Sequence, residues 1–107
     1  MKKGMIKVSA LYPNGEGKNF DLDYYMNKHS PMVGELLGDS LKGFAVESGM
    51  SGPEPGSAPA YMAMAHMYFD RIEDFQNSFG PNAEKIMSDI PNYTNSPPEL
   101  VISEVKK

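Results

Sequence analysis

The chain has 107 residues, a formal net charge of −4 and no cysteine. This length is that of a single domain, and the lack of cysteine excludes disulfides, zinc–thiolate sites and a thiol nucleophile. No basic face suited to nucleic acid and no 18-residue apolar stretch suited to a membrane span is evident, so we expect a cytoplasmic protein that binds neither nucleic acid nor membrane.

The N-terminal third of the chain is predicted to form a strand and a long helix. Residues Met5 to Tyr12 alternate between the two sides of a strand, with the apolar side chains on one face. Residues Asp21 to Leu37 carry apolar side chains at helical spacing, and Gly38 is a suitable end for that helix. Pro31 lies inside the helix and lacks an N–H group, so we expect a kink beside His29.

Two strands, an interrupted helical segment and a last strand follow. The predicted ranges are strands at Leu41–Ser48, Ala60–Phe69 and Glu99–Val105, and helices at Asp70–Phe79 and Asn82–Ile90. Asp70 and Glu73 have the spacing of a capping box at the start of the second helix. The strand at 60–69 is apolar on both faces, which is typical of a central strand that is covered on both sides.

The order βαββαβ predicts an α+β, ferredoxin-like fold, with two helices on one face of an antiparallel sheet. Such helices leave the other face of the apolar central strand uncovered. We therefore expect a homodimer whose sheets pack face to face. A chain of this length buries about two-thirds of its surface, which allows a modest pocket, or one shared with a second subunit.

The sharpest functional feature is His29, the only ionisable residue in the apolar stripe of the first helix. Burial lowers a histidine pKa because it disfavours the imidazolium, which leaves a neutral ring able to accept a proton near neutral pH. The structural alternative is a core histidine whose two nitrogens are bonded by backbone or tyrosine groups. His66, the other histidine, lies on the strand face of Met62, Met64 and Tyr68, where it would line the same pocket, line the dimer interface or be an ordinary strand residue. Two histidines without a shared carboxylate pattern do not indicate a metal site.

Several stretches resemble the EthD family, named for ethyl tert-butyl ether degradation and part of the dimeric α+β barrel superfamily. They are Phe20–Tyr25 with His29-Ser30-Pro31, Pro59-Ala60-Tyr61 with Phe69, Phe75 with Phe79, and Asp89–Thr94. Together they cover most of the chain in the right order, and the tyrosine pair followed by His-x-Pro is the most specific part in combination with the late Asp-Ile…Asn-Tyr-Thr. The resemblance implies one dimeric α+β barrel domain over residues 1–107, and it carries over Tyr25, His29, Pro31 and Tyr93 as positions that match the family pattern.

The resemblance implies a small organic ligand of aromatic, lactone or polyketide-like character, without fixing a reaction. We expect a cofactor-free isomerase or lyase that uses His29 as general acid/base, with Tyr25, His66 and Tyr93 binding the substrate and no metal ion. One alternative is a non-catalytic ligand-binding or accessory protein of a degradation pathway. Another is a haem-binding or monooxygenase-like relative in which His29 would be an axial ligand.

Overall fold

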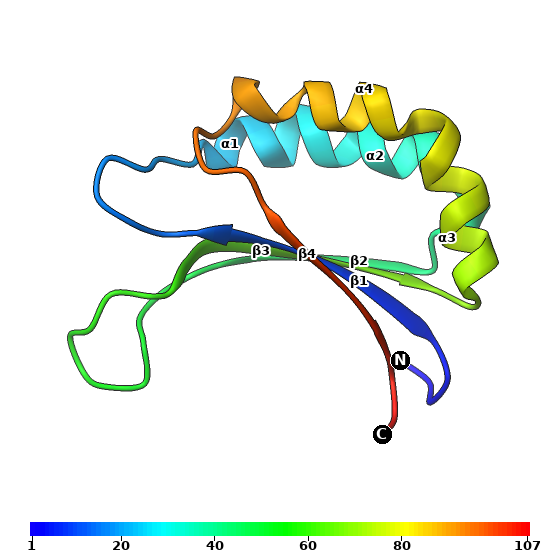
Figure 1. Cartoon of the computed structure of the whole chain (residues 1–107), viewed down its shortest axis with the longest axis horizontal. Coiled ribbons are helices and arrows are strands. Elements are labelled where there is room, and N and C mark those ends of the chain that lie inside the picture. The colour runs from blue at the N-terminus through cyan, green and yellow to red at the C-terminus, as the bar shows by residue number, and fades with distance from the viewer.

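A four-stranded antiparallel sheet carries all the helices on one face in the computed structural model, which describes all 107 residues (Figure 1). The strands are β1 (Ile6–Pro13), β2 (Gly43–Ser48), β3 (Tyr61–Phe69) and β4 (Glu99–Glu104), in the spatial order β2-β3-β1-β4. The helices are α1 (Leu22–Tyr24), α2 (Ser30–Leu37), α3 (Ile72–Phe79) and α4 (Ala83–Ser88). This arrangement confirms the predicted ferredoxin-like fold. None of the helices combines the length and the hydropathy that a membrane crossing requires.

The strand alternation decides which side chains meet the helices. Val8 on β1 lies opposite Met67 on β3, and Ala10 lies opposite Ala65. All four are buried beneath the helices, because successive side chains of a strand point to opposite faces. The intervening residues, such as Leu11, point to the face that carries no helix.

The first helical segment runs from residue 22 to residue 37 with a π-helical turn in its middle. The turn spans Tyr25–His29, and the Ser30 N–H donates to the carbonyl of Tyr25. We predicted a kink beside His29, and the irregularity there is a wider, π-helical turn that ends at His29, two residues before Pro31. A π turn places one extra residue in the helix and is frequent at functional sites.

The π turn also affects which residues face the sheet. Tyr25, His29, Val33 and Leu37 are all buried. In an α-helix, side chains four residues apart differ in direction by roughly 40° around the helix axis. The wider π-helical turn holds more residues per turn, so it reduces this difference and keeps the four side chains on one face. Met26 has an apolar side chain at helical spacing but is 47% exposed, so it lies outside the buried stripe.

Two predicted local features differ in the structure. Helix α3 begins at Ile72 after Arg71, which makes no side-chain cap hydrogen bond, so the predicted capping box of Asp70 and Glu73 does not form. Strand β2 begins at Gly43, two residues later than predicted, after a 3₁₀ turn at Gly38–Ser40.

The apolar core divides into two clusters along the sheet. One is centred on Phe69, which is fully buried beneath α3. The other gathers Tyr12, Tyr25 and Tyr93 at the start of the first helical segment. The Asp21 N–H donates to the carbonyl of Tyr93 at 2.7 Å, which ties the start of the first helical segment to the loop that precedes β4. The tyrosine cluster therefore has a defined position beside His29.

Candidate active site

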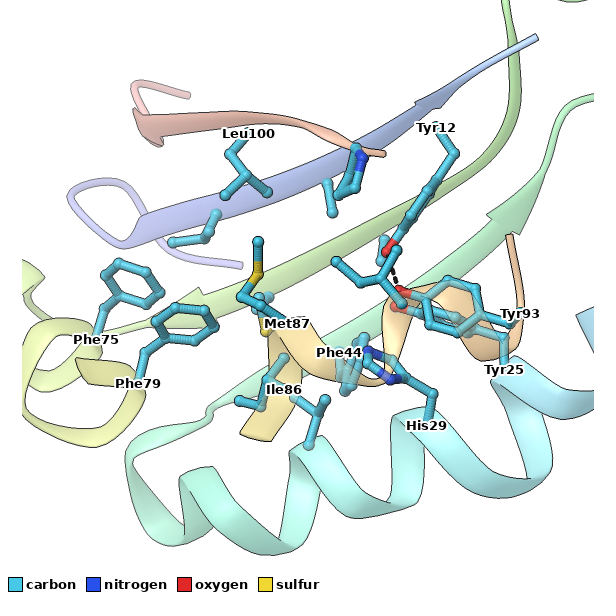
Figure 2. A pocket seen from close by; sticks show the side chains of 17 residues that line it. Tyr12, Tyr25, His29, Phe44, Phe75, Phe79, Ile86, Met87, Tyr93 and Leu100 are labelled. Carbon is cyan, nitrogen blue, oxygen red and sulfur yellow. Dashed lines mark hydrogen bonds between the residues drawn. The ribbon is translucent and has the colours of Figure 1, made fainter. Parts of the chain in front are cut away.

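An apolar cavity lies between the sheet and the helices, with a volume of about 520 Å³ including the part that opens to solvent. Fifteen of its seventeen lining residues are hydrophobic, and no lysine, arginine, aspartate or glutamate lines it. Figure 2 shows Phe75 and Phe79 at one end and the tyrosine cluster at the other. His29 is the one lining residue with an ordinary acid–base function near neutral pH.

His29 extends from the π-helical turn into this cavity, where it contacts two tyrosine rings. Its ring centroid lies 4.9 Å from that of Tyr25 and 4.7 Å from that of Tyr93. His29 Nδ1 is 2.9 Å from Oδ2 of Asp89. No buried side-chain nitrogen or oxygen lacks a hydrogen-bond partner, so the unbonded Nε2 of His29 keeps access to free space, and the His29 side chain lines the cavity.

Asp89, at the end of α4, holds His29 in this orientation. Its Oδ1 accepts hydrogen bonds from the Tyr24 hydroxyl at 2.7 Å and from Nδ2 of Asn92 at 2.9 Å. Burial alone would raise the pKa of Asp89, but the hydrogen bonds from Asn92, His29 and Tyr24 outweigh it and leave the pKa below its ordinary value. The carboxylate is therefore charged at neutral pH.

The charge state of His29 follows from burial and from this carboxylate. Burial lowers the pKa of His29, and the hydrogen bond and charge of Asp89 reverse only part of that effect, so the pKa stays below the ordinary value of 6.5. The imidazole is therefore neutral at pH 7. Because a carboxylate only accepts hydrogen bonds, the neutral ring carries its proton on Nδ1 and directs the lone pair of Nε2 into the cavity. This is the arrangement of a general base.

Three tyrosine hydroxyls gather at the same end of the cavity. The hydroxyls of Tyr12 and Tyr93 lie 2.7 Å apart (Figure 2). The Tyr25 ring packs edge-on against that of Tyr12 at a centroid distance of 6.2 Å, and its hydroxyl has no hydrogen-bond partner. Burial is the largest cause that raises the pKa of all three tyrosines above the ordinary value of 10. They are neutral phenols at physiological pH.

The structure places His66 on the opposite face of the sheet. Its Nδ1 is 2.8 Å from Oγ of Ser9, and its Nε2 is 3.1 Å from Oε1 of Glu47. Ala65 lines the cavity, and the next residue of the strand must point away from it. The cavity thus brings together Tyr25, His29 and Tyr93 of the expected site, and it does not include His66.

Sequence reasoning missed Asp89 and Tyr12 as members of this site. Asp89 belongs to the late stretch that resembles the EthD family, but nothing in its local pattern links it to a histidine 60 residues earlier. Tyr12 was expected on the buried face of the first strand. Its apolar neighbours gave it the pattern of a core residue, and its hydroxyl partner lies 81 residues away.

The fold and the cavity define a class of protein, the small ferredoxin-like domains that hold an apolar cavity between the helices and the sheet. Residues 15–97 match the model of the EthD domain. The structure of an EthD-like protein from Ralstonia eutropha JMP134 aligns with a TM-score of 0.90 at 41% sequence identity, over 96% of this chain and 93% of the other. The chain belongs to the EthD family.

More distant structures share the fold. An EthD family protein from Bacillus halodurans C-125 aligns with a TM-score of 0.64 at 23% identity, over 94% of this chain and 97% of the other. A monooxygenase of Streptomyces coelicolor in complex with nanaomycin D aligns with a TM-score of 0.62 at 9% identity, over 98% and 89%. At these identities the likeness extends to the fold alone. No curated protein matches the chain.

Proposed function

We propose that this protein catalyses a cofactor-free proton transfer, in an isomerase or lyase reaction, on a small organic molecule bound in the apolar cavity. The observation that carries the proposal is the His29–Asp89 pair. It combines a neutral imidazole, a charged carboxylate at 2.9 Å that fixes the tautomer, and a free Nε2 directed at a cavity.

The lining of the cavity indicates which molecules it would hold. A bound carboxylate or phosphate would lose its water without gaining a cationic partner, because no lysine or arginine lines the space. A neutral molecule of aromatic, lactone or polyketide-like character would bury its apolar surface without that cost. Tyr25 and Tyr93 would contact it beside His29.

In the proposed reaction His29 Nε2 removes a proton from an acidic C–H group of the substrate. The electron pair of that bond moves into the substrate, and the positive charge that forms on the imidazole is stabilised by Asp89. The proton then returns to a different carbon in an isomerisation, or to a departing group in a lyase reaction. This reaction needs no oxidant and no cofactor.

Deuterium exchange of a model ketone tests the proposal directly. 2-Tetralone is neutral and bicyclic, and it has acidic C–H groups beside its carbonyl. We expect the protein to accelerate exchange of these protons in D₂O, as followed by NMR. Because only the neutral imidazole accepts a proton, the rate should rise with pH through a midpoint below 6.5 and then level off.

The apolar lining also favours a second candidate, a protein that binds an organic ligand without transforming it. Apart from His29 the cavity offers only tyrosine hydroxyls as polar side-chain groups. Binding of 2-tetralone, seen as shifts in the protein NMR spectrum, without any acceleration of exchange would favour this candidate and contradict the enzymatic one.

We further propose that the protein is a homodimer paired through the face of the sheet that carries no helix. Met64 and Tyr68 lie half-buried on that face, and Val101 of β4 is 46% exposed on it. A second sheet would cover these apolar side chains. A ferredoxin-like protein of Bacteroides fragilis NCTC 9343, with a TM-score of 0.50 at 15% identity over 97% of this chain and 99% of the other, is described as dimeric.

Light scattering at micromolar protein concentration measures the oligomeric state. We expect twice the 11.8 kDa mass of the chain, and we expect a Met64→Glu variant to be monomeric because it would bury an unpaired charge at the interface. A mass of one chain for the unaltered protein would contradict the dimer.

A further inference from the structure

The three tyrosine hydroxyls beside His29 contain two more hydrogens than they use among themselves. Tyr12 bonds to Tyr93 at 2.7 Å, and the Tyr25 hydroxyl has no hydrogen-bond partner. A hydroxyl donates one hydrogen, so one bond within a set of three hydroxyls leaves two O–H groups without an acceptor in the set. None of the three hydroxyls is bonded to His29, to Asp89 or to a backbone carbonyl.

The remaining hydrogens have only the cavity in which to find an acceptor outside the set. All three tyrosines line that cavity, as His29 does. No buried polar side-chain atom in the chain lacks a partner, so the unbonded hydroxyl of Tyr25 reaches free space. A ligand oxygen at this end of the cavity would complete the network. The hydroxyls also polarise one another, because hydrogen bonds in a chain strengthen each other in a medium of low dielectric constant.

We infer that Tyr12, Tyr25 and Tyr93 form a donor site for a carbonyl oxygen, so that the ligand is a ketone or a lactone oriented with its carbonyl toward the tyrosines. This inference rests on the proposed function for its chemical consequence. When His29 removes a proton from the carbon beside the carbonyl, the electron pair of the C–H bond forms a C=C bond and the carbonyl oxygen becomes an enolate. The tyrosine donors stabilise the negative charge where it develops.

The chemistry of the cluster suits a donor and not a second base. Burial keeps the three hydroxyls protonated well above neutral pH. A site built to hydrogen-bond an oxygen also discriminates strongly against an analogue that lacks it, because its own polar groups are then left unpaired. The tyrosines would therefore set specificity as well as rate.

A pair of matched ligands tests the donor site separately from the base. 2-Tetralone and tetralin have the same ring skeleton and differ at the carbonyl. We expect protein-observed NMR titrations to give 2-tetralone an affinity at least roughly tenfold higher than that of tetralin. A Tyr12→Phe/Tyr25→Phe/Tyr93→Phe triple variant should bind the two ligands equally, and its exchange rate should fall on the order of 10²–10³-fold.

The control variants distinguish effects on folding, on the hydrogen-bond donor site and on the base. Removing the Tyr12 and Tyr93 hydroxyls together leaves neither of this bonded pair facing an unpaired partner, and the three single variants and far-ultraviolet circular dichroism check that the fold is kept. Tyr61→Phe removes a hydroxyl that bonds to Glu99 outside the cavity, so it should keep the preference. His29→Gln should keep the preference for 2-tetralone while losing exchange.

Each outcome has a defined meaning. The donor site would be overturned by equal binding of the two ligands by the unaltered protein, by a preference that survives in the triple variant, or by no binding of 2-tetralone at millimolar concentration. A tyrosine-dependent preference without any exchange would support the donor site and refute the proposed acid/base function. Exchange without a preference for 2-tetralone would refute the donor site and support the proposed acid/base function.

Discussion

Replacement of His29 by Gln is expected to lower the rate of 2-tetralone exchange by roughly 10²–10⁴-fold, the usual contribution of a positioned general base. Gln is of similar size and retains hydrogen-bonding groups, but its amide does not accept a proton at neutral pH. The ligand should still bind, since the cavity lining and the tyrosine hydroxyls are unchanged. Exchange kinetics and an NMR titration on the same sample measure the two effects separately.

A matched control is available in the second histidine. His66 lies on the opposite face of the sheet, bonded to Ser9 and Glu47. His66→Gln should therefore leave the exchange rate within a factor of two or so, as substitutions away from a site usually do. If His29→Gln kept full exchange, or if both variants lost it equally, the assignment of His29 as the base would be wrong.

Asp89→Asn tests the same base through its orienting partner. The carboxylate raises the pKa of His29 against the effect of burial and selects the tautomer with a proton on Nδ1. Without that charge the pKa falls further, so the midpoint of the pH–rate profile should move to lower pH while the plateau rate falls. An unchanged midpoint would show that Asp89 does not act through His29.

Phe69→Ala is expected to cost about 3–5 kcal/mol of unfolding free energy, the usual range for truncating a buried phenylalanine. Phe69 is 0% exposed at the end of β3, and its ring packs edge-on against Phe75 at a centroid distance of 5.3 Å. The structure around it relaxes only partly, so a cavity remains. Domains are commonly stable by only about 5–15 kcal/mol, so this variant should be partly unfolded at moderate temperature.

Urea denaturation followed by circular dichroism measures this loss. Phe69→Leu retains most of the buried side-chain volume and should lower the unfolding free energy clearly less than Phe69→Ala does. Met50→Ala, at a side chain that is 91% exposed, should change the stability by no more than about 0.5 kcal/mol. Equal effects of Phe69→Ala and Met50→Ala would contradict the account of the core given above.

Local sequence patterns were sufficient to predict the helices and strands and their order along the chain. The alternation along residues 5–12 and 60–69 predicted strands whose buried side chains the structure confirms, such as Val8 and Ala65. The spacing of Tyr25, His29 and Val33 predicted one buried helical face. These patterns repeat within a few residues, and the side on which a residue lies follows from the period of its own element.

Tertiary structure alone decided how the candidate site is assembled. Asp89 reaches His29 because the second half of the chain returns α4 alongside the first helical segment, and the hydroxyl of Tyr93 reaches that of Tyr12 across 81 residues of sequence. His66 lies on the other face of the sheet, because it follows the cavity-lining Ala65 by one residue in the strand. The spacing of the first helix predicted that His29 would lie on the buried face, with no other charged side chain in that stripe. Its partners depended on packing between distant segments, because a periodic pattern specifies which face a residue occupies and not which residue it meets there.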